Sequence, residues 1–206
     1  MERIYFVRHG ESEWNAIHRF QGQWDSDLTP RGREQADRNG RLLAGLGIGA
    51  LFVSPLDRAR QTAEIINAYL DVPALYDGRI MEWDCGDWSG HRREEVIDGW
   101  PAQWAARRAD LFHYRGPNCE NYPDMFDRAA PFVEELLALE AERVAVVSHG
   151  MIGKVMTSIL LGLDERATLA IYQPNDVIFA VTTGPDPASH HYRAGQGPFV
   201  GLTYFE

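Results

Sequence analysis

The chain has 206 residues, of which 45% are hydrophobic and 24% are charged, and its formal net charge is −10 at pH 7. These values are typical of a globular protein with one sizeable core and exclude a disordered tail. The acidic balance excludes a general nucleic-acid or anionic-membrane binder, so an anionic ligand would need a local cluster of basic side chains.

The sequence shows no pattern of a membrane or secreted protein. No apolar run approaches the roughly 18 residues of a membrane-spanning helix, and the N-terminal residues lack the pattern of a signal peptide. The two cysteines, Cys85 and Cys119, lack metal-site spacing and are too few for a disulfide scaffold. We therefore expect a cytoplasmic protein with reduced thiols and no membrane partner.

Short apolar runs predict buried strands, and helical spacing predicts helices between them. The strands are expected at residues 3–7, 50–53, 143–148, 177–181 and 199–204. The helices are expected from the N-cap Thr29 to about Leu43, from a cap-then-proline start at Ser54-Pro55 to about Leu70, from the N-cap Asn121 to about Glu142, and from Met151 to Leu161. Residues 14–28 are expected to form a loop with at most one helical turn.

Residues 78–118 interrupt this alternation. Tryptophans and arginines crowd there, and short helices are expected near residues 92–98 and 101–112. We interpret this segment as an excursion of helices and loops away from the sheet. Because strands elsewhere alternate with long helices, the pattern predicts one α/β domain over residues 1–206, a three-layer α/β/α sandwich with a mostly parallel central sheet.

Two histidines follow predicted strands directly, in Arg8-His9-Gly10 and in Ser148-His149-Gly150. If both strands are parallel and central, both imidazoles emerge at the same edge of the sheet. Arg8 adds a planar donor for phosphate or carboxylate, and imidazole is a nucleophile or base near neutral pH. Arg58 follows a third strand, and we choose it over Arg60 because residues two apart face different sides of a helix. These groups predict an anion site with a nucleophile.

Five motifs extend this pattern along the chain. They are Arg8-His9-Gly10-Glu11-Ser12-x-x-Asn15, Gly22-x-x-Asp25-x-x-Leu28-Thr29-x-x-Gly32, Ser54-Pro55-Leu56-x-Arg58-Ala59-x-Gln61-Thr62, Glu82-x-x-x-Gly86-x-Trp88-x-Gly90 and Ser148-His149-Gly150. In this order and approximate spacing they resemble the histidine phosphatase superfamily, which contains the cofactor-dependent phosphoglycerate mutases and many phosphomonoesterases. The resemblance covers residues 8 to about 152.

The resemblance implies a role for each matching residue. His9 would be the nucleophile that becomes a phosphohistidine, and Arg8, Arg58 and His149 would bind the phosphoryl oxygens. Glu82 would protonate the leaving oxygen and then activate the hydrolytic water, for which it must begin protonated. The further substrate-binding positions would be Ser12, Asn15, Gln21, Gly22 and Gly150. No metal or organic cofactor is expected, because arginine and histidine supply the charge stabilisation.

These expectations leave alternatives open. The leading hypothesis is a phosphomonoesterase for a small phosphorylated metabolite, and the alternatives are a phosphoglycerate mutase and a weakly catalytic protein that binds phosphorylated ligands. The excursion covers the pocket in relatives, so the arginines of residues 92–115 either contact a second anionic group or form a solvated helix face. Where many relatives read Gly-Glu-Ser, this chain has Cys119-Glu120-Asn121. Both a monomer and a homodimer remain possible.

Overall fold

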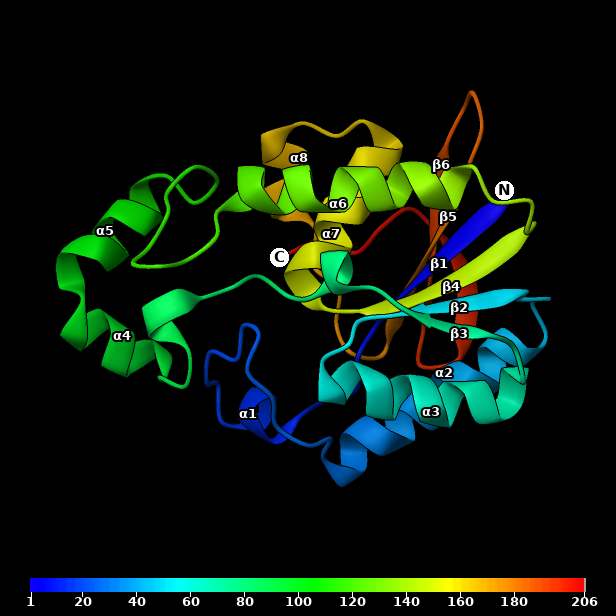
Figure 1. Cartoon of the computed structure of the whole chain (residues 1–206), viewed down its shortest axis with the longest axis horizontal. Helices are drawn as coiled ribbons and strands as arrows, with labels where there is room; N and C mark the ends of the chain where they lie inside the picture. The colour runs from blue at the N-terminus through cyan, green and yellow to red at the C-terminus, as the bar shows by residue number, and fades with distance from the viewer. Residues whose placement is uncertain (206) are drawn as a thin grey trace.

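A computed structural model describes residues 1–205, whose strands form one seven-stranded sheet (Figure 1). The strand order is β3-β2-β4-β1-β5-β6-β7. The strands are β1 (Arg3–Arg8), β2 (Ala50–Val53), β3 (Ala74–Tyr76), β4 (Arg143–Ser148), β5 (Val177–Thr182), β6 (Ala188–Arg193) and β7 (Gln196–Val200). The sheet is mixed and not mostly parallel as predicted, because β3, β2, β4 and β1 pair in parallel whereas β5, β6 and β7 continue it antiparallel.

Helices cover both faces of this sheet, which confirms the predicted three layers (Figure 1). Helices α2 (Pro30–Ala44) and α3 (Asp57–Leu70) pack together on one face, and α6 (Tyr122–Leu137) and α7 (Gly150–Leu161) pack together on the other. Strand β1 shows why both layers are needed: Ile4 and Phe6 belong to one buried cluster, and Tyr5 and Val7 belong to a second. Successive side chains of a strand point to opposite faces, so an uninterrupted apolar run requires cover on each side.

Two of the helix starts that rest on local signals are confirmed. Thr29 caps α2 by accepting a hydrogen bond from the Gly32 amide, and Pro30 occupies the first helical position. Asn121 caps α6 through the Asp124 amide. Helix α6 ends at Leu137 and not near residue 142 as predicted, because the chain must turn there to enter β4. The Glu142 carbonyl already accepts the amides at the start of β1.

Other predicted boundaries are wrong for reasons that lie outside the local sequence. Helix α3 begins at Asp57 and not at Ser54, and its N-cap residue Leu56 has no side-chain hydrogen bond. The predicted strand at 199–204 is displaced to β7, because Gly201 adopts a left-handed φ of +82° that ends the strand. The short elements β3, β6 and α8 (Glu165–Ala170) were not predicted. The turn expected within residues 14–28 is α1 (Glu13–Ala16).

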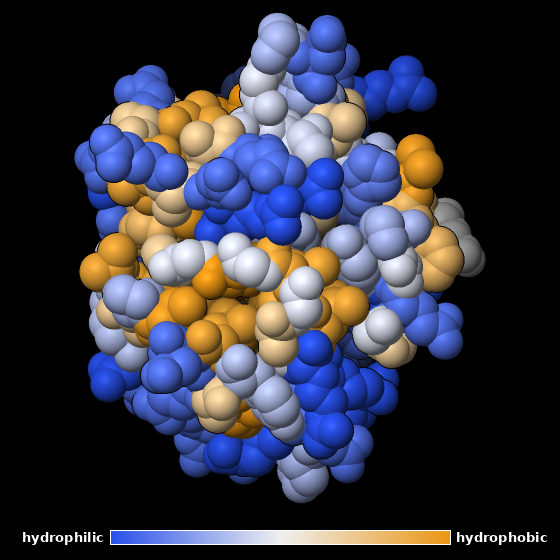
Figure 2. Space-filling model, turned by 90° about the vertical axis from the view of Figure 1, so that its right-hand side faces the viewer, coloured by the Kyte–Doolittle hydropathy of each residue, from blue (hydrophilic) through white to orange (hydrophobic). Residues whose placement is uncertain are grey.

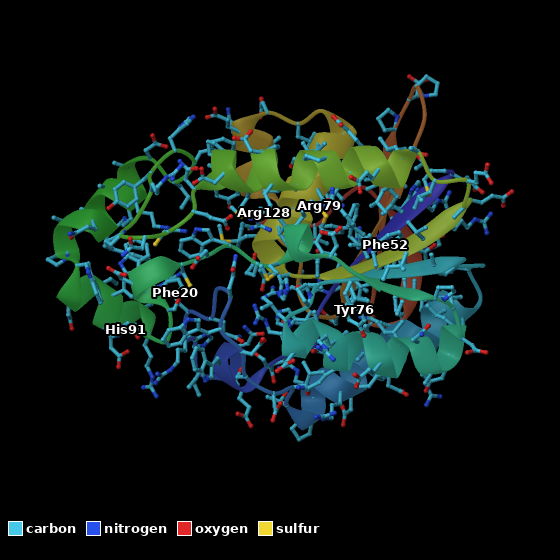
Figure 3. The ribbon with its side chains drawn as sticks, viewed as in Figure 1. Phe20, Phe52, Tyr76, Arg79, His91 and Arg128 are labelled. Atoms are coloured by element: carbon cyan, nitrogen blue, oxygen red, sulfur yellow. The ribbon has the colours of Figure 1, made fainter. Side chains whose placement is uncertain are left out.

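The excursion leaves the sheet at the end where β1 and β4 finish (Figure 1). It contains the 3₁₀ turns η1 (Gly78–Ile80) and η2 (Gly86–Trp88) and the helices α4 (Arg93–Gly99) and α5 (Pro101–Ala109), close to the predicted positions. The Phe20 ring packs against the rings of Trp83, Trp88 and Trp104. Backbone hydrogen bonds also join Phe20 to Gly90 and to His91, and Figure 3 shows Phe20 and His91 in the same part of the molecule. The excursion is thereby tied to the loop that follows α1.

Apolar side chains also reach the surface. Figure 2 shows the end of the molecule that lies to the right in Figure 1, where an apolar patch is surrounded by hydrophilic side chains. Exposed apolar side chains are a normal part of a protein surface. Among residues 1–205, no helix has both the length and the apolar character needed to cross a bilayer.

Candidate active site

His9 follows β1 directly and is only 3% exposed. Its Nδ1 lies 2.7 Å from the Gly10 carbonyl oxygen. A carbonyl oxygen can only accept, so Nδ1 carries the proton and Nε2 carries the lone pair. Burial, followed by the guanidinium groups of Arg58 and Arg8, holds the pKa of His9 well below its usual value. At neutral pH the ring is therefore uncharged, with Nε2 available as a nucleophile.

His149 follows β4, which pairs in parallel with β1, and the centroids of the His149 and His9 rings are 5.1 Å apart. This meeting of the two imidazoles confirms the expectation from the sequence. His149 Nε2 lies 2.7 Å from the Ser54 hydroxyl oxygen, whereas the buried Nδ1 has no hydrogen-bond partner among residues 1–205. Burial first, and then Arg58 and His9, holds the pKa of His149 well below its usual value. The second imidazole is thus also neutral, and one of its nitrogens faces no protein partner.

Arg58 lies in the first turn of α3 and is 1% exposed. Its terminal nitrogens donate to the carbonyls of Gly22 and Trp24 at 2.8 Å and to the Asp25 carboxylate at 2.7 Å. Its Nε donates to Nε2 of His9 at 3.3 Å. Arg58 and not Arg60 lies against His9, because Arg60 lies instead over the ring of Tyr76 on β3. The loop at residues 22–25 therefore holds one guanidinium group against the nucleophile.

Arg8 ends β1 and donates from one terminal nitrogen to the Gln173 carbonyl at 2.8 Å, while its buried Nε has no partner among residues 1–205. A Cβ atom built on Gly150 would lie 3.4 Å from the Arg8 guanidinium, an ordinary contact distance, so the two residues are neighbours. The Asn175 amide donates to the His9 carbonyl at 2.7 Å. The sequence analysis missed Gln173 and Asn175, because no spacing relates the segment before β5 to the end of β1.

Glu82 reaches the same region from the excursion. Its carboxylate accepts hydrogen bonds from the amides of Trp83, Met151 and Ile152 at 2.9 to 3.1 Å. Met151 and Ile152 lie in the first turn of α7, where amide groups are free to bind an anion. Arg128 holds the preceding backbone by donating to the carbonyls of Arg79 and Met81, and it pairs with Glu120 at 2.9 Å. Figure 3 shows Arg128 and Arg79 beside each other between α6 and η1. Glu82, Arg8 and Gly150 line one cavity of about 160 Å³.

Of the other predicted contact residues, Asn15 lines a cavity, whereas Ser12, Gln21 and Gly22 contact other protein groups. Asn15 lines a second cavity, of about 380 Å³, together with Arg8. Ser12 and Gln21 are buried and bonded to each other, and Ser12 also caps α1 in a reciprocal pair with Asn15. Gly22 supplies its carbonyl to Arg58 and approaches Cys85 too closely for a side chain at its left-handed φ of +53°. The structure thus gives Ser12, Gln21 and Gly22 supporting contacts, and substrate contact by these residues stays a prediction.

The arginines of the excursion do not share one environment. Arg107 lies over the rings of Trp83 and Trp104 at 5.4 and 5.6 Å, and burial lowers its pKa. Arg115 pairs with Asp124 at the start of α6. Arg92 and Arg108 are exposed on the surface. The excursion therefore contains one arginine that packs against aromatic rings, Arg107, and others that are exposed to solvent, Arg92 and Arg108.

The class of site follows from these contacts. A buried, unprotonated imidazole nitrogen, which accepts a hydrogen bond of 3.3 Å from Arg58, lies near a second guanidinium group and a second imidazole, a combination suited to a phosphoryl group. Among residues 1–205, no group of three or more His, Cys, Asp and Glu side chains is arranged to hold a metal ion. The class defined by fold and site is an α/β protein with a cluster of two buried histidines and two arginines at one edge of its sheet.

Comparison with known proteins identifies the family. The model of the histidine phosphatase superfamily (branch 1) matches residues 4–189, and this chain belongs to that superfamily. A protein named probable phosphoglycerate mutase GpmB from Erwinia tasmaniensis is 36% identical over 169 residues, which cover 81% of this chain and 78% of the relative. The protein of the same name from Salmonella newport is 35% identical over 171 residues, with the same coverage.

Solved structures show the same fold. A putative alpha-ribazole-5'-P phosphatase from Escherichia coli superposes with a TM-score of 0.87 at 22% identity and covers 98% of this chain and 99% of its own. A mycobacterial glucosyl-3-phosphoglycerate phosphatase, solved in complex with VO3, has a TM-score of 0.79 at 26% identity, covering 88% of this chain and 91% of its own. The predicted family and fold class are confirmed.

Proposed function

We propose that this protein is a phosphomonoesterase that transfers the phosphoryl group of a small phosphate ester to His9 and then to water. The observation that carries the proposal is the tautomer of His9. Its Nδ1–H donates to the Gly10 carbonyl oxygen, with 2.7 Å between the two atoms, and its Nε2 lies 3.3 Å from the Nε of Arg58. A neutral imidazole in that state attacks without first losing a proton.

In the first step Nε2 of His9 attacks phosphorus opposite the ester oxygen. The P–N bond forms as the P–O bond breaks, and the leaving oxygen keeps that electron pair and takes a proton from Glu82. Arg8, Arg58 and an Nδ1–H donor of His149 stabilise the charge on the three remaining oxygens. The support is geometric: each of these groups has an unpaired nitrogen or a guanidinium beside His9.

In the second step a water molecule attacks the phosphohistidine. Glu82, now ionised, takes a proton from the water, the P–N bond breaks, and its electron pair returns to Nε2 of His9. The products are an alcohol and inorganic phosphate, and both catalytic residues regain their starting states. Glu82 and Arg8 line the same cavity, and this observation supports a role for the Glu82 carboxyl group in both steps.

A phosphoglycerate mutase is the second candidate, favoured by the name of the relatives at 35 and 36% identity. A mutase uses the same phosphohistidine but returns the phosphoryl group to the substrate, so the site must exclude water while a bisphosphate is bound. Conversion of 3-phosphoglycerate into its 2-isomer without release of phosphate distinguishes it from a phosphatase.

The test compares the wild type with His9→Ala, using phosphate release from p-nitrophenyl phosphate and from sugar, glycerate and amino-acid phosphates. His190→Ala, on β6, serves as the matched histidine control. We expect release by the wild type and the control and none by His9→Ala at unchanged circular dichroism. Equal rates in all three proteins would overturn the proposal. If the wild type releases no phosphate but converts 3-phosphoglycerate into its 2-isomer, the protein is a mutase.

A further inference from the structure

Lys154 is the only lysine in a chain that contains 19 arginines. It lies on α7, and its side chain is buried, with 7% of the residue exposed. No ion pair among residues 1–205 involves its ammonium group, which lies over the face of the Phe205 ring, 5.2 Å from the ring centroid. A buried cation without a carboxylate partner is unfavourable unless another anion completes the site.

Helix geometry brings Lys154 to the proposed active site. Residues four apart lie on the same helix face about one turn apart, which relates Lys154 to Gly150. Gly150 is a neighbour of Arg8, because a Cβ atom built on Gly150 would lie 3.4 Å from the Arg8 guanidinium. Lys154 lines the same cavity of about 160 Å³ as Arg8 and Glu82. Lys154 therefore lines the same cavity as Arg8, which is proposed to bind phosphate, and Glu82, which is proposed to protonate the leaving oxygen.

The other walls of this cavity and its size restrict what can occupy it. Tyr172 and Phe205 supply aromatic surface, and Met151 supplies a flexible apolar side chain. A cavity of about 160 Å³ is smaller than the pockets that hold drug-sized ligands. It fits a leaving group of a few carbon atoms that presents an anionic group to the ammonium nitrogen.

The charges around Lys154 agree with a site that awaits an anion. Burial lowers the pKa of Lys154 to about 8, with Arg8 and Arg107 acting in the same direction and Glu82 opposing them. These groups come from β1, α5 and the loop after η1, and Tyr172 faces the same cavity from the loop after α8. A bound anion would favour the protonated amine and add an opposite charge to a region with an excess of cations.

We propose that Lys154 binds a second anionic group, a carboxylate or a phosphate, on the leaving group of the substrate, and so determines specificity. The substrate class is a phosphate monoester with a short, anionic leaving group. This inference rests on the proposed phosphatase function. Recognition by a compact ammonium group suits either anion, because lysine acts as a point charge.

The kinetic test compares esters that differ only in the second anion. The carboxylate pair is 3-phosphoglycerate and glycerol 3-phosphate, and the phosphate pair is the bisphosphate and monophosphate of propane-1,3-diol. In the wild type, we expect kcat/KM to be about tenfold or more higher for the anionic member of one pair, which identifies the anion. Lys154→Met should remove that preference, mainly through KM. Arg166→Met, which removes an exposed cation on α8, should keep it.

The outcomes separate the two proposals. A wild type that hydrolyses the esters of both pairs without preference retains the phosphatase function and overturns the role of Lys154. A preference that survives in Lys154→Met overturns it as well. A wild type that hydrolyses no ester contradicts the phosphatase function, and the role of Lys154 is then decided by binding alone.

The binding test uses the single lysine. Apart from the α-amino group of Met1, Lys154 is the only amine in the sequence, so an amine-reactive reagent reports on it alone in the corresponding peptide. We expect glycerate or inorganic phosphate to slow modification of Lys154 near pH 8, whereas glycerol does not. Equal rates with all three additives would overturn the proposal. This measurement requires no turnover.

The pH dependence supplies a further readout. As the pH rises through about 8, Lys154 loses its proton and the preference for the anionic ester should decline in the wild type. Lys154→Arg, which stays protonated, should keep its preference to about pH 9. Parallel declines in both proteins would assign the effect to Arg8, Glu82, Arg107 or Tyr172, which face the same region, and would contradict the role of Lys154.

Discussion

The hydroxyl oxygen of Ser54 lies 2.7 Å from Nε2 of His149, which joins the residue after β2 to the residue after β4. The Ser54 oxygen also receives a longer hydrogen bond of 3.4 Å from the Leu56 amide. The Ser54 hydroxyl can donate its own proton to Nε2, and a neutral ring in that arrangement carries its proton on Nδ1. In this arrangement Ser54 sets the tautomer in which His149 can donate to a phosphoryl oxygen. The sequence analysis had assigned Ser54 to a helix cap.

Ser54→Ala should lower kcat by about tenfold, equivalent to about 1.4 kcal/mol in the activation free energy, because His149 loses the partner that orients its ring. KM should change little. Phosphate release under saturating ester checks this. Ser158→Ala is the matched control, since the Ser158 hydroxyl is buried on α7 and has no partner among residues 1–205. An unchanged kcat in Ser54→Ala would show that other contacts orient His149.

Asp25→Asn should weaken both catalysis and folding. The carboxylate pairs with Arg58 at 2.7 Å and accepts the Asp57 amide at 2.9 Å, so it caps α3 from a distant loop. We expect kcat/KM to fall by about tenfold to a hundredfold through displacement of Arg58, and the free energy of unfolding to fall by about 1 kcal/mol through the weakened cap. Enzyme kinetics and urea unfolding measure the two effects. Asp37→Asn, which removes an exposed partner of Arg41, should alter neither.

Folding stability should decline as the pH falls below about 6.5. Burial holds the pKa values of His9 and His149 below that of the unfolded chain, so the unfolded state binds protons that the folded state does not. Each histidine then removes up to about 1.4 kcal/mol per pH unit between pH 6.5 and its folded pKa. Urea unfolding between about pH 5 and 7 measures the slope. His9→Gln should show a slope shallower by one proton, and identical slopes would contradict the prediction.

Gly32→Ala should destabilise the protein by about 3 kcal/mol. A Cβ atom there would lie 2.0 Å from the Glu11 carbonyl oxygen, a backbone atom that cannot move without shifting the loop after His9. Thermal unfolding and residual phosphate release measure the loss. Gly78→Ala is the control, because no heavy atom lies within 4 Å of its added Cβ. A stable Gly32→Ala protein would mean that α2 can move away from that loop.

The groups proposed to react were predictable because each follows a recognisable strand or helix start. His9 and His149 come directly after apolar strands, and parallel pairing of β1 with β4 brings them together. Arg58 lies in the first turn of a helix after β2. A strand followed by a polar residue is a local pattern, and the rule that parallel strands end at the same edge supplies the rest.

The groups that hold these residues were not predictable from local patterns. Asp25 reaches Arg58 across 33 positions, and Asn175 reaches the His9 carbonyl across 166. Ser54 was assigned to a cap because serine followed by proline is a common helix start. The structure shows instead that the β2–β4 pairing places its hydroxyl against His149. Such contacts depend on strand order and loop path, which periodicity does not encode.

By itself, the sequence determined the class of fold, the caps Thr29 and Asn121, and the histidines and arginines at the sheet edge, since all of these rest on interactions within a few residues or on alternation along an element. Tertiary structure alone decided where α3 begins, which hydrogen-bond partners the imidazoles meet, and that the single lysine lines a cavity with Arg8 and Glu82. The physical reason is that burial and hydrogen-bond partners are properties of neighbours in space. Those neighbours are known only when the sheet order and the loops between its strands are known.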